Sequence, residues 1–326
     1  MRKITYFKTM LVAIALIVGS RSASAQSLYE GFNYTVGTNM GGNTTATLEG
    51  PNNNWYTHSN SKVGTIDVTS GSLTYTGLAS SVGNKVRLPG DNTNVPRDVN
   101  TAITGTGANI VYFSVLVNVA DATQLNTTGD YFMSLGGATG AVTNTSLGGR
   151  LYIKSVNTAA NYRLMITNNS SGTVTQTEFA TDLNFGSTYL VVVKYDKGVT
   201  PNTASLWVNP SSLGSSEPTG SVSNSSGTGV MTTFASICLR NSSGTPKADI
   251  DEIRVGTTWA SVTPIDNTTS INQATTASTI YTSNGNVVLT EIAGRSVEIY
   301  NSIGQRLIST KTLEGVNTIP VSTRGV

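Results

Sequence analysis

Short runs of β-branched and aromatic residues recur along most of the chain, separated by Gly, Asn, Ser and Pro. No segment keeps the apolar spacing that an amphipathic helix needs. Many such runs with turn-forming residues between them predict an all-β chain folded as a two-sheet antiparallel sandwich. The expected strands cover residues 72–75, 85–88, 110–119, 131–135, 150–154, 162–166, 189–195, 204–208, 234–240 and 249–255.

Two of these runs are apolar on both faces. Residues 110–119 and 189–195 lack the polar alternation of a strand that faces water on one side. We therefore expect them to be central strands, covered on one face by the partner sheet and on the other by loops.

The first 25 residues have the layout of a secretory signal peptide. A positively charged start is followed by an apolar run over residues 10–18 and by Ala23-Ser24-Ala25. This run is too short to anchor the chain as a membrane helix, so we expect cleavage between Ala25 and Gln26. No later stretch of the sequence is long and apolar enough for a membrane helix.

The formal net charge of +2 is carried by this leader. Residues 1–25 hold four of the 20 Lys and Arg residues and none of the 18 Asp and Glu residues, so cleavage leaves 16 against 18, a charge near −2. This balance removes the electrostatic case for a nucleic-acid partner. Only 12% of residues are charged, yet 38% are hydrophobic, which suits an extracellular β protein with a neutral polar surface.

The C-terminal part reads as a separate small β domain. Asn284-Gly285 between two β-rich runs predicts a tight hairpin, because both residues tolerate positive φ. The stretch VEIYNSIGQRL at 297–307, within a match over residues 271–326, resembles the type A C-terminal sorting domain of the Bacteroidetes type IX secretion system. That family continues beyond the position of Gly325-Val326, so the domain, expected over 280–326, is expected to be incomplete.

The larger part, residues 26–264, resembles the concanavalin A-like (LamG-like) jelly-roll domains of secreted bacterial proteins. The resemblance rests on six blocks in the family's order: YEGFNY at 29–34, SGSLTYTGL at 70–78, GDYFMSLG at 129–136, LVVVKYD at 190–196, SLWVNP at 205–210 and IDEIRVGTTW at 250–259. It implies a jelly roll whose first and last strands lie side by side, and it implies no single activity. The polar residues 265–279 are expected to link the two domains.

The sequence offers little for catalysis. His58 is the only histidine and Cys238 the only cysteine, so a zinc site of the usual ligands and an intrachain disulfide are excluded. We expect His58, in a polar loop, at the surface and Cys238 buried in a strand. The acidic cluster Asp249, Asp251 and Glu252 lacks the Glu-x-Asp-x-x-Glu spacing of laminarinase-type hydrolases, so a closing strand with edge charges is the simpler reading.

The sequence also contains two candidate ligand sites. With a period of two, Asp251 shares a face with Ile253, which directs its carboxylate into the sandwich. Glu30, on the neighbouring first strand, is then a candidate partner in a calcium site, the alternative being that Asp251 bonds backbone N–H groups or Arg254. Trp55 and Tyr56, in an Asn-rich loop, are the candidate platforms for sugar stacking, or else caps of the sandwich.

These observations favour a secreted or outer-surface binding or adhesion protein, without catalytic residues, that is exported by the type IX machinery and binds extracellular glycans. Calcium is the only cofactor that the sequence suggests. The alternative is an extracellular polysaccharide hydrolase or lyase of the same fold.

Overall fold

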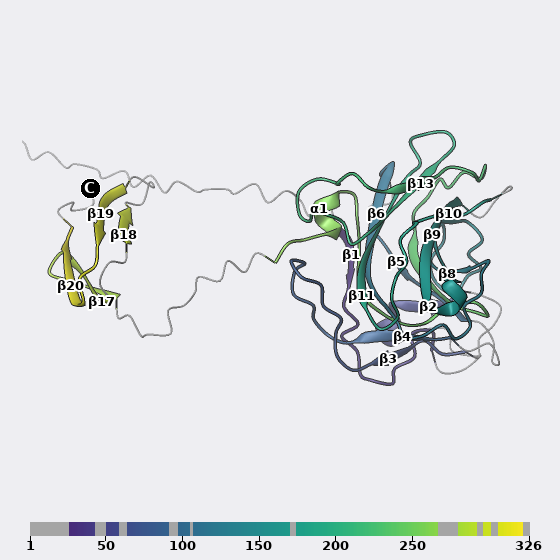
Figure 1. Ribbon diagram of the computed structural model, residues 1–326, viewed down its shortest axis with the longest axis horizontal. Helices are drawn as coiled ribbons and strands as arrows, with labels where there is room; N and C mark the ends of the chain where they lie inside the picture. The colour runs from purple at the N-terminus through teal and green to yellow at the C-terminus, as the bar shows by residue number, and fades with distance from the viewer. Residues whose placement is uncertain are drawn as a thin grey trace, which may run out of the picture. The chain divides into compact units, whose positions relative to one another are not determined.

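The computed structural model describes residues 26–42, 50–58, 64–90, 97–104, 107–169, 174–266, 280–291, 296–300 and 306–321. The chain divides into two compact units, residues 1–266 and 267–326, and strands dominate both (Figure 1). Among the described residues, no helix could cross a membrane. The expected signal peptide with Ala25, the linker residues 267–279 and the segment 301–305 of the sorting-domain match lie outside the described ranges.

Sheet A of the larger unit has eight antiparallel strands. Its path runs β13-β12-β11-β6-β15-β4-β3, and β1 pairs with β15 beside this path. The strands are β1 Gln26–Glu30, β3 Asp67–Thr69, β4 Lys85–Pro89, β6 Ile110–Val119, β11 Thr188–Asp196, β12 Thr203–Val208, β13 Val222–Asn224 and β15 Lys247–Gly256.

Sheet B has seven antiparallel strands in the order β10-β9-β8-β7-β14-β5-β2. They are β2 Trp55–Thr57, β5 Arg97–Ala102, β7 Asp130–Gly136, β8 Leu147–Val156, β9 Asn161–Asn169, β10 Thr177–Glu178 and β14 Ser236–Asn241. Two short 3-10 turns, η1 Pro51–Asn53 and η2 Asn157–Ala159, precede β2 and β9. The two sheets form an antiparallel jelly-roll sandwich, as the sequence predicts, and the first and last strands pair through β1 and β15.

The main core lies between the sheets. Val115 and Val193 of sheet A and Leu151 and Ile166 of sheet B belong to one cluster of side chains that are wholly removed from water. Each such side chain contributes about 1.5–3 kcal/mol relative to an exposed one. Side chains alternate between the two faces of a strand, so the residues next to these along each strand of sheet B point away from the core.

A second apolar cluster covers the outer face of sheet A. It contains Leu116 of β6 and Leu190 of β11, together with Trp207 and Trp259. Helix α1 Trp259–Val262 packs on β6 and β15 there (Figure 1). This cover explains why both central strands are apolar on two faces, and it confirms their predicted central positions.

A β-bulge in β15 changes the direction of its side chains. The register with β6 shifts between Asp251 and Arg254, and Glu252 has φ 55°. An extra residue in one strand breaks the two-residue alternation. Ile253 therefore faces the core, whereas Asp251 pairs with Leu116 of the outer cluster. The expectation that Asp251 and Ile253 share a face is wrong for this reason.

Other sequence predictions also fail locally. Residues 72–75 form no strand; the chain there is a loop whose Leu73 N–H donates to Asp251. Strands β2 and β5 were not expected, because their outward residues are polar and Val99 is the only strongly apolar residue of β5.

The described residues of the smaller unit form two antiparallel sheets. One has the order β16-β17-β20, and the other pairs β18 with β19. The strands are β16 Ile280–Ser283, β17 Asn286–Glu291, β18 Ser296–Tyr300, β19 Arg306–Lys311 and β20 Gly315–Pro320. Asn284 (φ 48°) and Gly285 (φ 79°) turn the chain between β16 and β17, which confirms the predicted hairpin.

Candidate functional site

A cavity with a volume of about 480 Å³ lies beside β1 and β2. Three tyrosines, Tyr29, Tyr34 and Tyr56, line it, and we call it the tyrosine cavity. Its other lining residues are Leu28, Glu30, Asn54, Thr101, Ala102, Thr139 and Gly140. Its volume falls in the range of natural small-ligand sites, and aromatic walls with a few polar groups are typical of them.

Tyr29 is fixed from two sides. Its hydroxyl donates to Oε1 of Glu252 (2.8 Å), and the guanidinium of Arg254 lies 4.8 Å from its ring centroid. Burial and the Glu252 carboxylate raise the pKa of the Tyr29 phenol well above its ordinary range. Tyr29 is 39% exposed, so a held ring still presents surface to a ligand.

Tyr34 is held by Glu30. One oxygen of that carboxylate accepts from the Tyr34 hydroxyl (2.7 Å) and from the indole N–H of Trp55 (2.9 Å). The other accepts from the backbone N–H of Phe32 (2.7 Å). Glu30 is buried, and through these three hydrogen bonds it organises one wall of the cavity.

The outer face of sheet B carries a row of polar and aromatic side chains. Strand pairing places Asp98 of β5 opposite Arg240 of β14, and Tyr131 of β7 opposite Tyr152 of β8. Their neighbours Val99, Leu239 and Leu151 belong to the core, so these side chains point outward.

Arg240 is compensated by acidic groups. Its Nη1 lies 3.2 Å from Asp98 and its Nε 4.0 Å from Asp130, and its guanidinium stacks 4.6 Å from the ring centroid of Tyr131. Burial raises the pKa of Asp98 to about 6, although Arg240 opposes that shift. Burial likewise raises the pKa of Asp130.

Arg150 lies against two neighbouring rings. Its guanidinium carbon is 5.2 Å from the ring centroids of both Tyr131 and Tyr152, whose own centroids are 5.7 Å apart. Its Nη2 donates to the backbone carbonyl of Asn169 (2.9 Å). Sequence reasoning did not single out this residue, because Arg150 becomes distinctive only once two strands align the tyrosines beside it.

His58 is buried rather than at the surface, which corrects the sequence expectation. The side-chain amide of Asn100 lies between His58 and the loop that bears Gly140. The amide oxygen accepts from the Gly140 N–H (3.0 Å), and the amide nitrogen donates to the Gly140 carbonyl (3.0 Å). This fixes the amide orientation, so the amide nitrogen, 3.0 Å from His58 Nδ1, donates to that atom and the ring proton sits on Nε2. Burial, with Arg240 nearby, lowers the pKa of His58 to about 4.

The two carboxylates expected to share calcium are not brought together. Glu30 pairs with core-facing Ile253 and lies among core residues, whereas Asp251 lies on the outer face of sheet A. The Asp251 oxygens accept from the N–H groups of Leu73 (2.7 Å) and Glu252 (2.8 Å), the alternative that the sequence left open. Among the described residues, no three His, Cys, Asp or Glu side chains gather as a metal site.

The two expected sugar platforms differ. Trp55 is wholly buried and stacks on Phe32 with centroids 6.0 Å apart, so it is a core residue and offers no surface. Tyr56, its neighbour on β2, points the other way and lines the tyrosine cavity.

Two other residues singled out in the sequence lie in strands. Gln26 begins β1, and Cys238 is buried in β14, where burial raises the pKa of its thiol to about 12.

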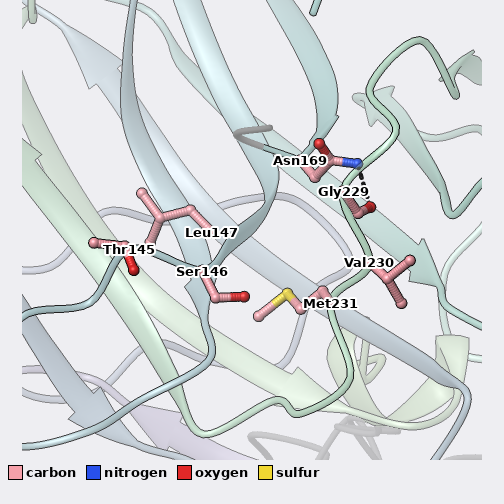
Figure 2. A pocket seen from close by; sticks show the side chains of 7 residues that line it. All are labelled: Thr145, Ser146, Leu147, Asn169, Gly229, Val230 and Met231. Carbon is pink, nitrogen blue, oxygen red and sulfur yellow. Dashed lines mark hydrogen bonds between the residues drawn. The ribbon is translucent and has the colours of Figure 1, made fainter. Parts of the chain in front are cut away.

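A smaller hollow of about 180 Å³ lies at the ends of β8 and β9. Figure 2 shows Asn169 donating to the Gly229 carbonyl (2.7 Å) on one side of it and Thr145 and Ser146 on the other. No charged side chain lines this hollow, and its polar groups are amides and hydroxyls.

No family model matches the chain, and no curated protein matches its sequence. Solved structures do resemble it. An endo-β-1,4-glucuronan lyase from the fungus Trichoderma reesei has 12% identity and a TM-score of 0.43, with 73% of this chain and 98% of the lyase covered.

Two further structures are similar to it. The globular domain of T. cruzi calreticulin has 12% identity and a TM-score of 0.39, with 71% of this chain and 88% of that domain covered. The Emp47p carbohydrate recognition domain has 11% identity and a TM-score of 0.36, with 72% and 98% covered. At these values, ligand and activity have to be argued from this chain's own residues.

Proposed function

We propose that the larger unit is a glycan-binding module and that the tyrosine cavity is its binding site. The observation that carries the proposal is a cavity of about 480 Å³ walled by Tyr29, Tyr34 and Tyr56. Sugars present flat C–H faces that pack on aromatic rings, and their hydroxyls require a few polar partners. Asn54 and Thr139 supply such partners in the same cavity.

The rigidity of the walls supports this assignment. Glu252 and Arg254 hold Tyr29, and Glu30 holds Tyr34, so two of the three rings are oriented before any ligand arrives. A preorganised ring loses little conformational freedom on binding. The cavity is therefore suited to a ligand with modest contact area.

A hydrolase or lyase of the same fold is the alternative, and the described residues favour it less. The gap beside His58, Asp98 and Arg240 measures about 10 Å³, about the space of one water. His58 Nδ1 already accepts a hydrogen bond, so the proton of the ring lies on its other nitrogen. This leaves the only histidine without a free basic nitrogen in its neutral form.

We also propose that the protein reaches the outer surface or the medium through a signal peptide on residues 1–25 and a type IX sorting domain on residues 280–326. The separate compact unit 267–326, built of short antiparallel strands, supports a domain of its own there. A reporter placed between the two segments, with the sorting domain completed by that family's final strand, is expected in the medium or on the surface of a type IX-competent host. Periplasmic retention would contradict the sorting assignment.

Glycan binding is tested with the full chain on a panel of plant, algal and bacterial glycans. Retention of at least one class above the level of a denatured sample is the expected result. Absence of retention on every class would overturn the binding proposal while leaving the export proposal open to its own test.

A further inference from the structure

Four cationic side chains lie on the outer face of sheet B, and three of them have a carboxylate partner. Arg240 pairs with Asp98, Lys154 with Glu178, and Arg163 with Glu178 and Asp182. Arg150 is the fourth. Within the described part of the chain, no carboxylate lies within 4.0 Å of it.

The donors of Arg150 are mostly unused. A guanidinium has five N–H donors, and the bond from Nη2 to the Asn169 carbonyl is the one that the described residues provide. Its Nε is buried without a hydrogen-bond partner. The residue as a whole is half-buried, and Nε is the one nitrogen of its guanidinium found both buried and without a partner among the described residues.

The rings of Tyr131 and Tyr152 hold this charge in place. Each lies 5.2 Å from the guanidinium carbon, a distance at which the ring quadrupole attracts a cation. These contacts attract the guanidinium without neutralising it, and its bond to the Asn169 carbonyl orients it. The result is an oriented, planar cation with free donors, which matches the geometry of a carboxylate or sulfate.

We propose that Arg150, with Tyr131 and Tyr152 beside it, binds the acidic group of a carboxylated or sulfated glycan. This rests on the proposed function, because it specifies the class of glycan. The site is separate from the tyrosine cavity: four strand spacings, about 19 Å, lie between Tyr56 on β2 and Arg150 on β8. The loop bearing Gly140 and Asn144 packs on β5 and β14 between them.

The experiment measures affinity by calorimetry for three hexasaccharide probes: an oligogalacturonate, a sulfated oligosaccharide and neutral cellohexaose. The full chain is compared with Arg150→Gln, Arg150→Lys and the control Arg163→Gln. Arg163 lies on the same sheet face and its loss changes the net charge equally, but its charge is already compensated. Melting curves check that each variant is folded.

Wild-type protein is expected to bind at least one acidic probe more tightly than cellohexaose, and the probe preferred tells carboxylate from sulfate. Arg150→Gln is expected to weaken that binding about 10-fold or more, as for loss of a charge-assisted bond, and Arg150→Lys by a smaller factor. Arg163→Gln is expected to change it less than about twofold.

Three results would overturn the inference. In the first, the acidic probes bind the wild type no better than cellohexaose does. In the second, Arg150→Gln binds the acidic probe as tightly as the wild type. In the third, Arg150→Gln and Arg163→Gln lose the same amount of affinity for it. In each of these cases, binding of cellohexaose that Tyr56→Ala removes would still support the tyrosine cavity. Failure of the inference is thereby separated from failure of the proposed function.

Discussion

The guanidinium of Arg254 lies 4.8 Å from the ring centroid of Tyr29 and forms a buried ion pair with Glu252, which in turn accepts a bond from the Tyr29 hydroxyl. The bulge at Glu252 makes this arrangement possible, because it turns Asp251 and Arg254 to the outer face while Ile250 and Ile253 stay in the core. A local irregularity in the closing strand thus positions one wall of the tyrosine cavity.

Removing one partner of this ion pair should be costly. Arg254→Met leaves Glu252 buried and uncompensated, and we expect the free energy of unfolding to fall by about 3–5 kcal/mol. The double variant Arg254→Met, Glu252→Gln should recover part of that loss, since no uncompensated charge remains. Urea denaturation measures both. A double variant as unstable as the sum of the two single variants would contradict a coupled pair.

Asp251 should make stability depend on pH. Burial raises its pKa from 3.8 to about 7, so the native state binds the proton more tightly than the unfolded state does. The stabilisation by this proton is complete below pH 3.8 and is lost as the pH rises through about 7.

The test compares Asp251→Asn with wild type by urea denaturation from pH 4 to pH 8. The variant lacks one hydrogen-bond acceptor at every pH, which changes its free energy of unfolding by a constant amount, but its Asn side chain does not titrate. Its free energy of unfolding relative to wild type should therefore rise with pH across this range. A difference that is independent of pH would mean that Asp251 keeps its ordinary pKa.

His58 can be followed directly, because it is the only histidine. The pKa of about 4 lies below the ordinary 6.5, so the neutral ring stabilises the native state above pH 6.5 and this contribution is lost as the pH falls through 4. NMR of ¹⁵N-histidine-labelled protein should give a midpoint near 4 and a proton on Nε2. A midpoint near 6.5 would place the ring in water instead.

Calcium should not act through Glu30 and Asp251. The two carboxylates lie on opposite faces of sheet A, and each accepts bonds from N–H or O–H donors. We expect the same melting temperature with a chelator as with millimolar calcium. A rise of several degrees in calcium that Asp251→Asn abolishes would contradict this placement and restore the calcium site.

The fold was predictable from the sequence because its central strands are mostly apolar on both faces. Residues 110–119 were expected as a strand and coincide with β6, which needs apolar residues toward both the core and the outer cluster. Strand β5 could not be found in this way. Asp98 and Asn100 face outward, and their role depends on Arg240 and Gly140, which are distant in sequence.

The candidate site was predictable only in part. Tyr56 was expected as a platform, and it does line the tyrosine cavity, but its neighbour Trp55 is a core residue. The difference is one position on a short strand, which reverses the direction of the side chain. Asp251 was misplaced for a related reason, since a bulge at Glu252 has no signature in a single sequence.

The most direct test of the tyrosine cavity is the affinity of Tyr56→Ala for the glycan that the wild type binds best, measured by calorimetry beside Tyr281→Ala. Tyr281 is 52% exposed on the smaller unit and serves as a control for loss of a surface ring. We predict at least about a 10-fold loss of affinity, roughly 1.4 kcal/mol, in Tyr56→Ala and no change in Tyr281→Ala, with unchanged melting temperatures. Wild-type affinity in folded Tyr56→Ala would contradict the assignment of the cavity as the glycan site.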